Sequence, residues 1–350
     1  MDAWRKVARV LDVSKAYIFL ALYKLSLAIF MILVEYIVDD GVSALVIVVY
    51  EHVIATVVLF ILAFFLERNK IPPLSLKIIC YAFLLGLLQV ALCQTLLTMS
   101  LDYVSSTYQS VALNLVPVIV FVLALIFQQE KLKCWSIIGQ AKIWGLIISA
   151  GGALALVLWK GPVLLKSTSY SFTIQLEATS DEVIGCTMIV VGIFATSLWY
   201  VLLGHVIRLY PAEVSLTAIM SLFGTIQTAI VSVFVTSTSA WKLQWLNGLT
   251  LIVLLLGGFF VTGLAYYLMT WSVKKKGPVF TAAFNPLLIF FSILLQTIVL
   301  GSATHLGSVV GAVLVIIGLY FILWAKAKEL DAVNNLDESH DSLSTPLVEP

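Results

Sequence analysis

Ten long apolar segments dominate this sequence of 350 residues, and most of the connections between them are short. A helix that crosses a bilayer needs about 20 mainly apolar residues, and each segment supplies them. Hydrophobic residues make up 61% and charged residues 11% of the chain, against about 45–50% and about 25% in soluble domains. The sequence therefore predicts an all-α, polytopic membrane protein with ten transmembrane helices. The expected spans are 16–38, 44–66, 77–100, 103–127, 136–159, 183–204, 213–236, 249–272, 279–300 and 305–325.

Lysine and arginine are unequally distributed between the two sides of the predicted bundle. Fifteen fall on the side of the chain termini, and three (Lys160, Lys166 and Lys242) fall on the other side. Because short cytosolic loops carry an excess of these residues, we expect both termini to be cytosolic. Lys142 lies near the cytosolic end of its span, so we expect its long side chain to reach the interface.

Two short patterns recur in the same order in each half of the chain. They are Asn114-Leu-Val-Pro117 with Ser136-Ile-Ile-Gly139, and Asn285-Pro286 with Ser308-Val-Val-Gly311. An odd number of helices per repeat inverts the second copy, which is typical of transporters. The sequence thus predicts two inverted five-helix repeats. The expected parts are a cytosolic segment 1–15, repeats 16–159 and 183–325, a non-cytosolic loop 160–182 and a disordered cytosolic tail 326–350.

Pro117 and Pro286 are expected to kink their helices, because proline removes a backbone donor and clashes with the preceding turn. Matched kinks in both repeats could act as hinges or line a cavity. A purely structural kink is the alternative for each proline.

Four ionisable side chains lie within the first two spans: Lys24, Glu35, Glu51 and His52. Charges at membrane depth are costly and usually face a cavity or a partner. Glu51, with His52 beside it, is the candidate proton carrier. Lys24 and Glu35, almost three helical turns apart, share one face and are candidates for charge selection. A structural ion pair or a contact with the outer vestibule is the alternative for Glu51.

Neutral polar residues also occur at membrane depth. Gln94, Asn114, Tyr266, Tyr267 and Asn285 are candidates for solute contact. Asn114 and Asn285 stand out because each lies beside an expected kink. The alternative for the whole set is hydrogen bonding between helices.

Several sites are absent from the sequence. It contains no GxxxxGK[ST], HExxH or GxSxG pattern. Its four cysteines lack metal-ligand spacing, and a net charge of +1 does not favour nucleic acid. We expect no enzymatic activity, cofactor or metal. The expected partners are the lipid bilayer, a small solute and protons, with a homodimer as a further expectation.

Longer strings resemble the plant UmamiT family, also called nodulin-like or walls-are-thin-related transporters, of the drug/metabolite transporter superfamily. The resemblance covers about 14–328 and includes Val49-Tyr-Glu-His52, Tyr103-Val-Ser-Ser-Thr-Tyr108, Gln129-Glu-Lys-Leu132, Tyr210-Pro-Ala-Glu-Val-Ser-Leu-Thr-Ala218 and Lys274-Lys-Lys-Gly-Pro-Val-Phe280. It implies two inverted EamA repeats and facilitated or proton-linked movement of amino acids, or of auxin in some members. Of the two membranes that the family uses, we expect the plasma membrane rather than the vacuolar membrane.

The chain departs from the family pattern at charged positions. Members usually carry Lys where Glu35 stands, Arg where Glu51 stands and Gln where Lys24 stands, and an acidic residue near Ser302 is replaced. If those cations meet a substrate carboxylate, this chain should bind such anions poorly. It could instead take cations or neutral solutes, use the acids as proton carriers, or have lost transport. Purine-like substrates and a non-transporting membrane scaffold or sensor remain alternatives.

Overall fold

The computed structural model describes residues 2–68, 72–104, 109, 112–130, 132, 135–159, 163–165, 180–241, 248–299 and 304–344. Within these residues, seven helical stretches are long and apolar enough to cross a membrane, and three shorter apolar helices accompany them. Together they match the ten expected spans, so the prediction of an all-α polytopic membrane protein is confirmed. The long stretches are Tyr17–Val38, Ala44–Glu67, Leu76–Ser100, Asp181–Leu209, Glu213–Val235, Gly248–Lys276 and Val309–Glu329; the shorter helices are Val116–Ile126, Ile137–Gly152 and Pro278–Ser292.

The first repeat begins with two continuous helices, and its third span is interrupted. Serine hydroxyls cap two of its helices, as helix N-termini prefer. Ser75 accepts a hydrogen bond from the Ile78 amide at 3.4 Å, and Ser136 accepts one from the Gly139 amide at 3.0 Å. The elements are α1 (Asp2–Asp39), α2 (Ala44–Glu67), α3 (Leu76–Gly86), the π-helix η1 (Leu87–Gln94), α4 (Thr95–Ser100), α6 (Val116–Ile126) and α7 (Ile137–Leu158).

The second repeat follows the same order. Its elements are α8 (Ser180–Leu209), α9 (Glu213–Val235), the 3-10 helix η2 (Thr238–Trp241), α10 (Gly248–Leu256), the π-helix η4 (Gly257–Leu264), α11 (Ala265–Lys276), α12 (Pro278–Ala282), α13 (Pro286–Val299) and α14 (Leu306–Ser344). Two short strands, β1 (Val163–Leu165) in the loop between the repeats and β2 (Thr304–His305) directly before α14, pair antiparallel.

Both repeats carry the same two irregularities. A π-helix interrupts the third span of each, as η1 and as η4. The fourth span is broken in each, by a turn at Asn114 and Leu115 before α6 and by a turn at 283–285 between α12 and α13. Pro117 lies in the first turn of α6, and Pro286 is the first residue of α13. Backbone nitrogens in the first turn of a helix have no intrahelical acceptor, so a proline there costs no hydrogen bond. A kink was expected at each proline; the structure has a turn between two helices just before each one.

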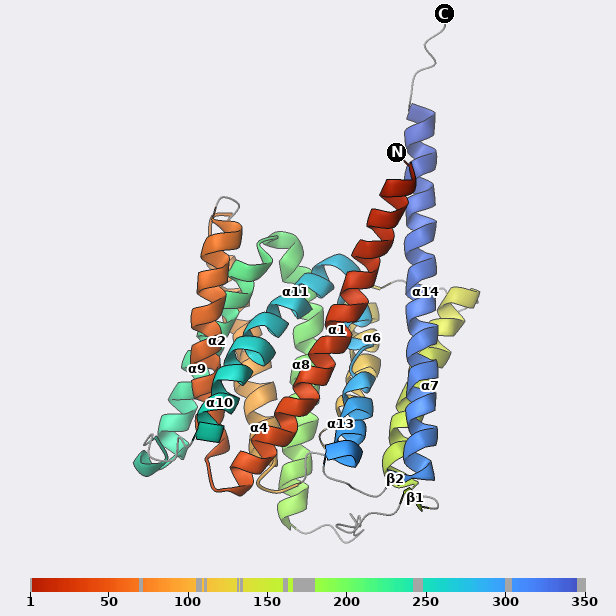
Figure 1. Ribbon diagram of the computed structural model, residues 1–350. Helices are drawn as coiled ribbons and strands as arrows, with labels where there is room; N and C mark the ends of the chain where they lie inside the picture. Colours follow the sequence, from red (N-terminus) through yellow and green to blue (C-terminus); the bar gives the residue numbers. More distant parts are fainter. Residues whose placement is uncertain are drawn as a thin grey trace, which may run out of the picture.

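Helices with the same position in the two repeats pack against each other. α2 contacts α9, and α7 contacts α14 along its length (Figure 1). Gly145 and Gly318 permit the close approach of α7 and α14, because a Cβ on Gly145 would lie 2.8 Å from the Gly318 carbonyl oxygen. Small residues at such crossings are the usual means by which membrane helices pack closely.

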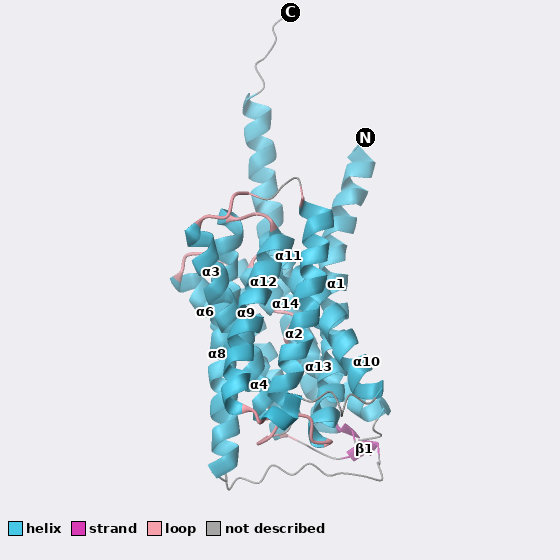
Figure 2. Cartoon of the chain, turned by 90° about the vertical axis from the view of Figure 1, so that its left-hand side faces the viewer, coloured by secondary structure: helices cyan, strands magenta, loops and turns pink. Residues whose placement is uncertain are grey.

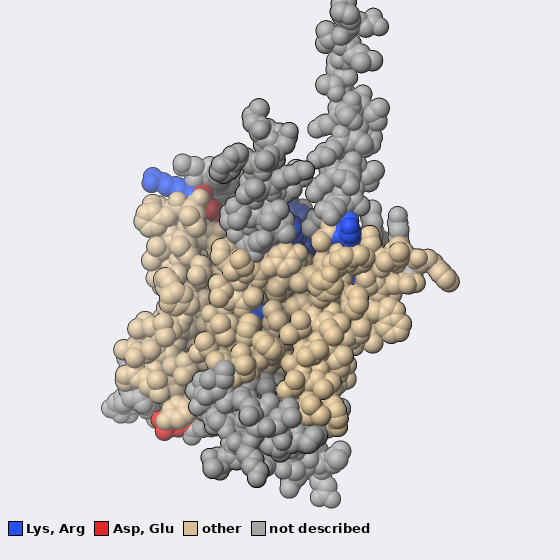
Figure 3. All heavy atoms as spheres, turned by 45° about the vertical axis from the view of Figure 1, so that its right-hand side comes forward, with Lys and Arg blue, Asp and Glu red and all other residues tan. Residues whose placement is uncertain are grey.

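The first residues of α1 and the last residues of α14 extend from the same end of the bundle, which we call the terminal end, whereas β1 lies at the opposite, loop end (Figure 2). On the face shown in Figure 3, a broad belt with few charged side chains lies between the two ends. On the face shown, most lysine and arginine side chains gather along the terminal edge of this belt. This agrees with the excess of lysine and arginine on the side of the termini, from which we predict that both termini are cytosolic.

The structure corrects the expected tail. Residues 326–350 were predicted to be disordered, but α14 continues through Ser344. Positions 326–344 contain neither glycine nor proline, and alanine, leucine, lysine and glutamate favour helix there. The first proline after α14 is Pro346, which disfavours helix at the residue before it. At the other terminus, α1 begins at Asp2, so residues 2–15 extend the helix of the first span. Most of loop 160–182 lies outside the described residues.

Candidate functional site

A cavity lies at the centre of the bundle, where both repeats contribute side chains. Together with open solvent at its mouth, its space is about 970 Å³. Most of the polar lining comes from α1, from the two π-helices, from the start of α11 and from the turn after α12. Polar residues in the lining include Tyr23, Lys24, Glu51, Gln89, Gln94, Gln109, Thr196, Thr262, Tyr266 and Asn285.

Lys24 brings a buried cation to this cavity. Its side chain is only 4% exposed, and its Nζ donates a hydrogen bond to Asn285 Oδ1 at 2.7 Å. The same nitrogen lies 4.6 Å from the centre of the Tyr23 ring. Within the part of the chain that the structure describes, Lys24 has no carboxylate within ion-pair distance. Neutral groups therefore hold this cation and leave its charge uncompensated.

Glu51 brings a buried carboxyl group to the same cavity. It is 1% exposed, and it accepts hydrogen bonds from Thr262 Oγ1 and, at 3.2 Å, from Gln94 Nε2. Gln94 belongs to η1 and Thr262 to η4, so each π-helix supplies one donor. η4 can approach α2 because Gly258 lacks a Cβ, which would lie 2.8 Å from the Glu51 carbonyl oxygen. No ion pair to Glu51 occurs among the described residues.

A chain of neutral hydrogen bonds continues from Glu51 across the cavity wall. The Tyr266 hydroxyl donates to Gln94 Oε1 at 2.7 Å and accepts from Gln89 Nε2 at 3.4 Å. Gln89 Oε1 in turn accepts from the Thr196 hydroxyl at 3.1 Å. Connected hydrogen bonds of this kind in a low-dielectric interior fix side-chain positions. The wall is thus preorganised around the carboxyl group.

The cavity brings together five of the residues that the sequence predicted for it. Lys24, Glu51, Gln94, Tyr266 and Asn285 line it, whereas Glu35, His52, Asn114 and Tyr267 are not among the described lining residues. Thr262 contacts Glu51, Gln89 contacts Tyr266 and Thr196 contacts Gln89, and none of the three was chosen from the sequence. The pair Gly257-Gly258 is the sequence feature that indicates a close approach of η4 to a neighbouring helix. The functional role of every candidate stays a prediction.

His52 follows Glu51 in the sequence but lies outside the cavity lining. Its side chain is fully buried, and its Nδ1 lies 2.9 Å from the Val48 carbonyl oxygen of the same helix. Its ring packs edge-on against Tyr266, with centroids 6.0 Å apart. None of the described hydrogen bonds joins the His52 ring to the Glu51 carboxyl group.

The cavity extends towards the loop end, where Val34 of α1 and Leu101 after α4 line it. On the other side of Lys24, aromatic rings of α1 and α12 and the turn after α12 pack together. Tyr17 lies 5.2 Å from Phe280 and 6.0 Å from Phe284, measured between ring centroids. Phe280 and Phe284 are buried. This aromatic cluster packs α1 against α12 and the turn that follows it.

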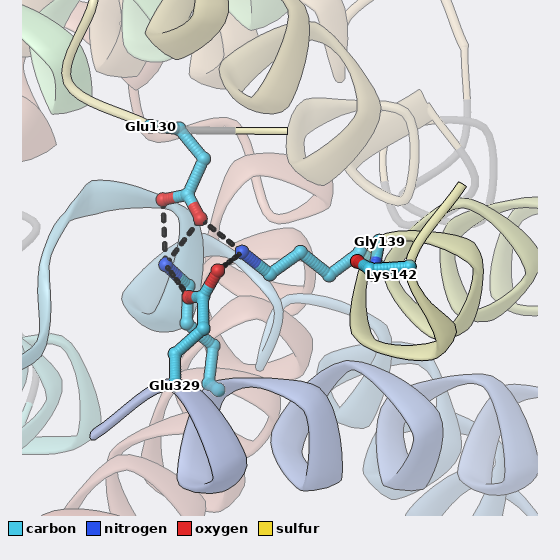
Figure 4. A network of polar contacts seen from close by, with 6 residues as sticks. Glu130, Gly139, Lys142 and Glu329 are labelled. Carbon is cyan, nitrogen blue, oxygen red and sulfur yellow. Dashed lines mark hydrogen bonds and ion pairs between the residues drawn. The ribbon is translucent and has the colours of Figure 1, made fainter. Parts of the chain in front are cut away.

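A second group of charges lies at the terminal end, between the connection after α6, α7 and α14 (Figure 4); Lys142 and Glu130 are buried, and Lys326 and Glu329 are partly buried. Lys142 contacts Glu130 at 2.5 Å and also Glu329, and Lys326 contacts Glu130 at 2.5 Å and Glu329 at 3.3 Å. Lys142 is 1% exposed. The expectation that its ammonium reaches the interface is therefore wrong, because two carboxylates neutralise it inside the protein.

Known proteins match this chain over most of its length. A sequence profile of the EamA-like transporter family matches residues 14–159 and 183–324. The WAT1-related protein At5g64700 of Arabidopsis thaliana is 34% identical over 332 residues, covering 91% of this chain and 92% of the relative. The WAT1-related protein At3g30340 of the same plant is 33% identical over 327 residues, covering 91% and 89%.

A solved structure titled "Crystal structure of protein" superimposes with a TM-score of 0.66 at 14% identity, covering 91% of this chain and 99% of that one. It supports the fold alone. The expected resemblance to the walls-are-thin-related transporters is confirmed by the two relatives, and the family is one of membrane transporters rather than enzymes. The chain belongs to the EamA-like transporter family and carries two copies of its domain.

Proposed function

We propose that this protein is a secondary transporter of small zwitterionic solutes, with amino acids as the first candidates. The observation that carries the proposal is that Lys24 and Glu51, two buried groups of opposite formal charge, line one cavity without neutralising each other. A free amino acid has a carboxylate that suits Lys24 and an ammonium that suits Glu51. Charges at this depth are functional by default in membrane proteins.

Transport would proceed by alternating access, in which the two repeats rock around the central cavity. The matched breaks before Pro117 and Pro286 are the proposed hinges, because each lies where backbone hydrogen bonding is interrupted in its repeat. Glu51 is also the proposed proton carrier, since a carboxyl group held by the neutral donors of Thr262 and Gln94 can exist in either protonation state. We further propose that the termini are cytosolic and that the plasma membrane is the site of action.

The test is saturable uptake and efflux of radiolabelled amino acids, with auxin alongside, in oocytes at pH 5.5 and 7.5. The Glu51→Gln variant keeps the size of the side chain and removes its charge, so uptake should be abolished at equal surface expression. Asp181→Asn is the matched control, because this exposed carboxyl group at the start of α8 lies outside the cavity. Unchanged uptake in Glu51→Gln would contradict the role of Glu51.

Two further outcomes separate the alternatives. Inhibition of uptake by nucleobases but not by amino acids would contradict the zwitterion and favour a purine-like substrate. A non-transporting scaffold is contradicted by any solute that both crosses the membrane and raises the melting temperature of the purified protein, because a ligand that binds only the folded state stabilises it.

A further inference from the structure

The terminal end of the bundle carries a second hollow, separate from the central cavity. It measures about 1070 Å³ of open space. The connection after α6, the end of α8, the α11–α12 junction and α14 surround it. We call it the basic hollow, because five of its lining residues are cationic. These are Arg208, Lys274, Lys275, Lys276 and Lys326.

Two of these five cations are already neutralised. Lys326 pairs with Glu130, and Lys274 pairs with Glu213 while donating to the Pro211 carbonyl oxygen at 2.5 Å. Glu130 and Glu329 together balance Lys142 and Lys326 in the cluster of Figure 4. That cluster therefore adds no net charge to the hollow.

The other three cations, Arg208, Lys275 and Lys276, form no ion pair within the part of the chain that the structure describes. Each lines the hollow. The only acidic residue in the described lining is Glu130, which already forms ion pairs with Lys142 and Lys326. Three positive charges thus lie along one concave surface without a counterion among the described residues.

Part of the wall of the hollow has no bulky side chains, which leaves room for an anion. Its wall includes Gly204 and the turn Gly277-Pro278, where Gly277 has φ +90°. A side chain would be strained at that φ, so the turn keeps this part of the wall free of bulk. A guanidinium fork and two ammonium groups along one concave surface are the donors that recognise phosphate oxygens.

The position of the hollow fits the headgroup level of a bilayer. α8 ends at Leu209, which is 47% exposed, and α11 ends at Lys276. The lysine and arginine distribution predicts that this end faces the cytosol. Anionic lipids concentrate in the cytosolic leaflet, and basic pockets between membrane helices on that side bind phosphorylated headgroups.

We propose that the basic hollow binds a phosphate group, presented by the headgroup of an anionic lipid or by free phosphate. The hollow shares no described lining residue with the central cavity. The proposal therefore does not depend on what the cavity transports, and each can fail without the other.

The test measures stabilisation of the purified full-length protein by three probes: dioctanoyl phosphatidylinositol 4-phosphate, inorganic phosphate, and dioctanoyl phosphatidylcholine as the lipid without net charge. The phosphoinositide should raise the melting temperature saturably, and the effect should weaken with salt because exposed charges are screened. The combined variant Arg208→Gln, Lys275→Gln and Lys276→Gln should lose affinity by about 100-fold, at about fivefold for each cation removed.

The matched control is Arg68→Gln, Lys77→Gln and Lys328→Gln, which removes the same charge from the same end but outside the hollow. Its affinity should stay near that of the unaltered protein. If the triple variant is unstable, Lys275→Gln alone should still weaken binding about fivefold. Binding of the phosphoinositide alone identifies a lipid headgroup site, and binding of inorganic phosphate as well identifies a general phosphate site. No binding of either probe, equal binding of phosphatidylcholine, or equal loss in the control overturns the proposal.

Discussion

Buried charged side chains occur at two places in this protein. At one place opposite charges neutralise them, and at the other they contact only neutral groups. At the terminal end, Lys142 and Lys326 meet Glu130 and Glu329, so each charge faces an opposite one. In the central cavity, Lys24 meets an amide, and the donors to Glu51 are a hydroxyl and an amide. In the first arrangement, the charges of the two lysines and two glutamates cancel. The second leaves charges that a bound solute can still neutralise.

The difference has an energetic meaning. Removing one member of a buried ion pair leaves the other charge uncompensated in a low-dielectric interior, which is strongly destabilising. Removing a buried charge that has no ion partner removes its desolvation cost as well. The terminal-end cluster should therefore contribute mainly to stability, and the cavity charges mainly to binding. Three substitutions test this contrast.

The largest effect is expected from Glu130→Gln at the terminal end. This change leaves Lys142 and Lys326 buried with Glu329 as their only carboxylate in the cluster. The free energy of unfolding should fall by about 3–5 kcal/mol, the usual cost of breaking a buried pair. Thermal unfolding of the purified protein measures the change.

The double variant Glu130→Gln with Lys142→Met is its control. It removes one charge of each sign and leaves Lys326 paired with Glu329, so most of the lost stability should return. If the single and double variants unfold at the same temperature, charge balance is not what the cluster contributes, and the contrast with the cavity fails.

A smaller effect, of the opposite kind, is expected from Lys24→Met. Loss of the ammonium should raise KM for a zwitterionic solute about tenfold, which corresponds to about 1.4 kcal/mol of binding. The melting temperature should not fall, because the methionine fills similar space without a buried charge. Uptake over a range of solute concentrations gives KM. A lower melting temperature with unchanged KM would show that Lys24 belongs with the structural charges.

The parts of this structure that were predictable depend on local chemistry. The spans follow from the length of apolar runs, and the breaks before Pro117 and Pro286 follow from a missing donor and a steric clash. Lys24 and Glu51 could be selected because charge is rare at membrane depth. Each of these features is carried by a residue and its immediate neighbours in the sequence.

The parts that were not predictable depend on contacts between distant segments. Thr262 meets Glu51 across 211 positions of the chain, and the sequence of η4 does not show that contact. His52 was paired with Glu51 because the two are adjacent, but adjacent helical residues point about 100° apart. The charge partners of Lys142 come from α14 and from the connection after α6. Only the packed structure separates a neutralised lysine from an available one.

The smallest effect separates two neighbours that the sequence treats alike, Tyr266 and Tyr267. Tyr266 lines the cavity and donates its hydroxyl to Gln94, the residue that also donates to Glu51. Tyr267 is only partly buried and is not in the described lining. Tyr266→Phe should lower uptake about fivefold, since a hydrogen bond of this kind contributes about 1 kcal/mol. Tyr267→Phe, which removes the same oxygen, should leave uptake unchanged at equal surface expression. Equal losses in both variants would mean that the hydroxyl network does not hold the Glu51 carboxyl group in place, and the availability of that group would then need another cause.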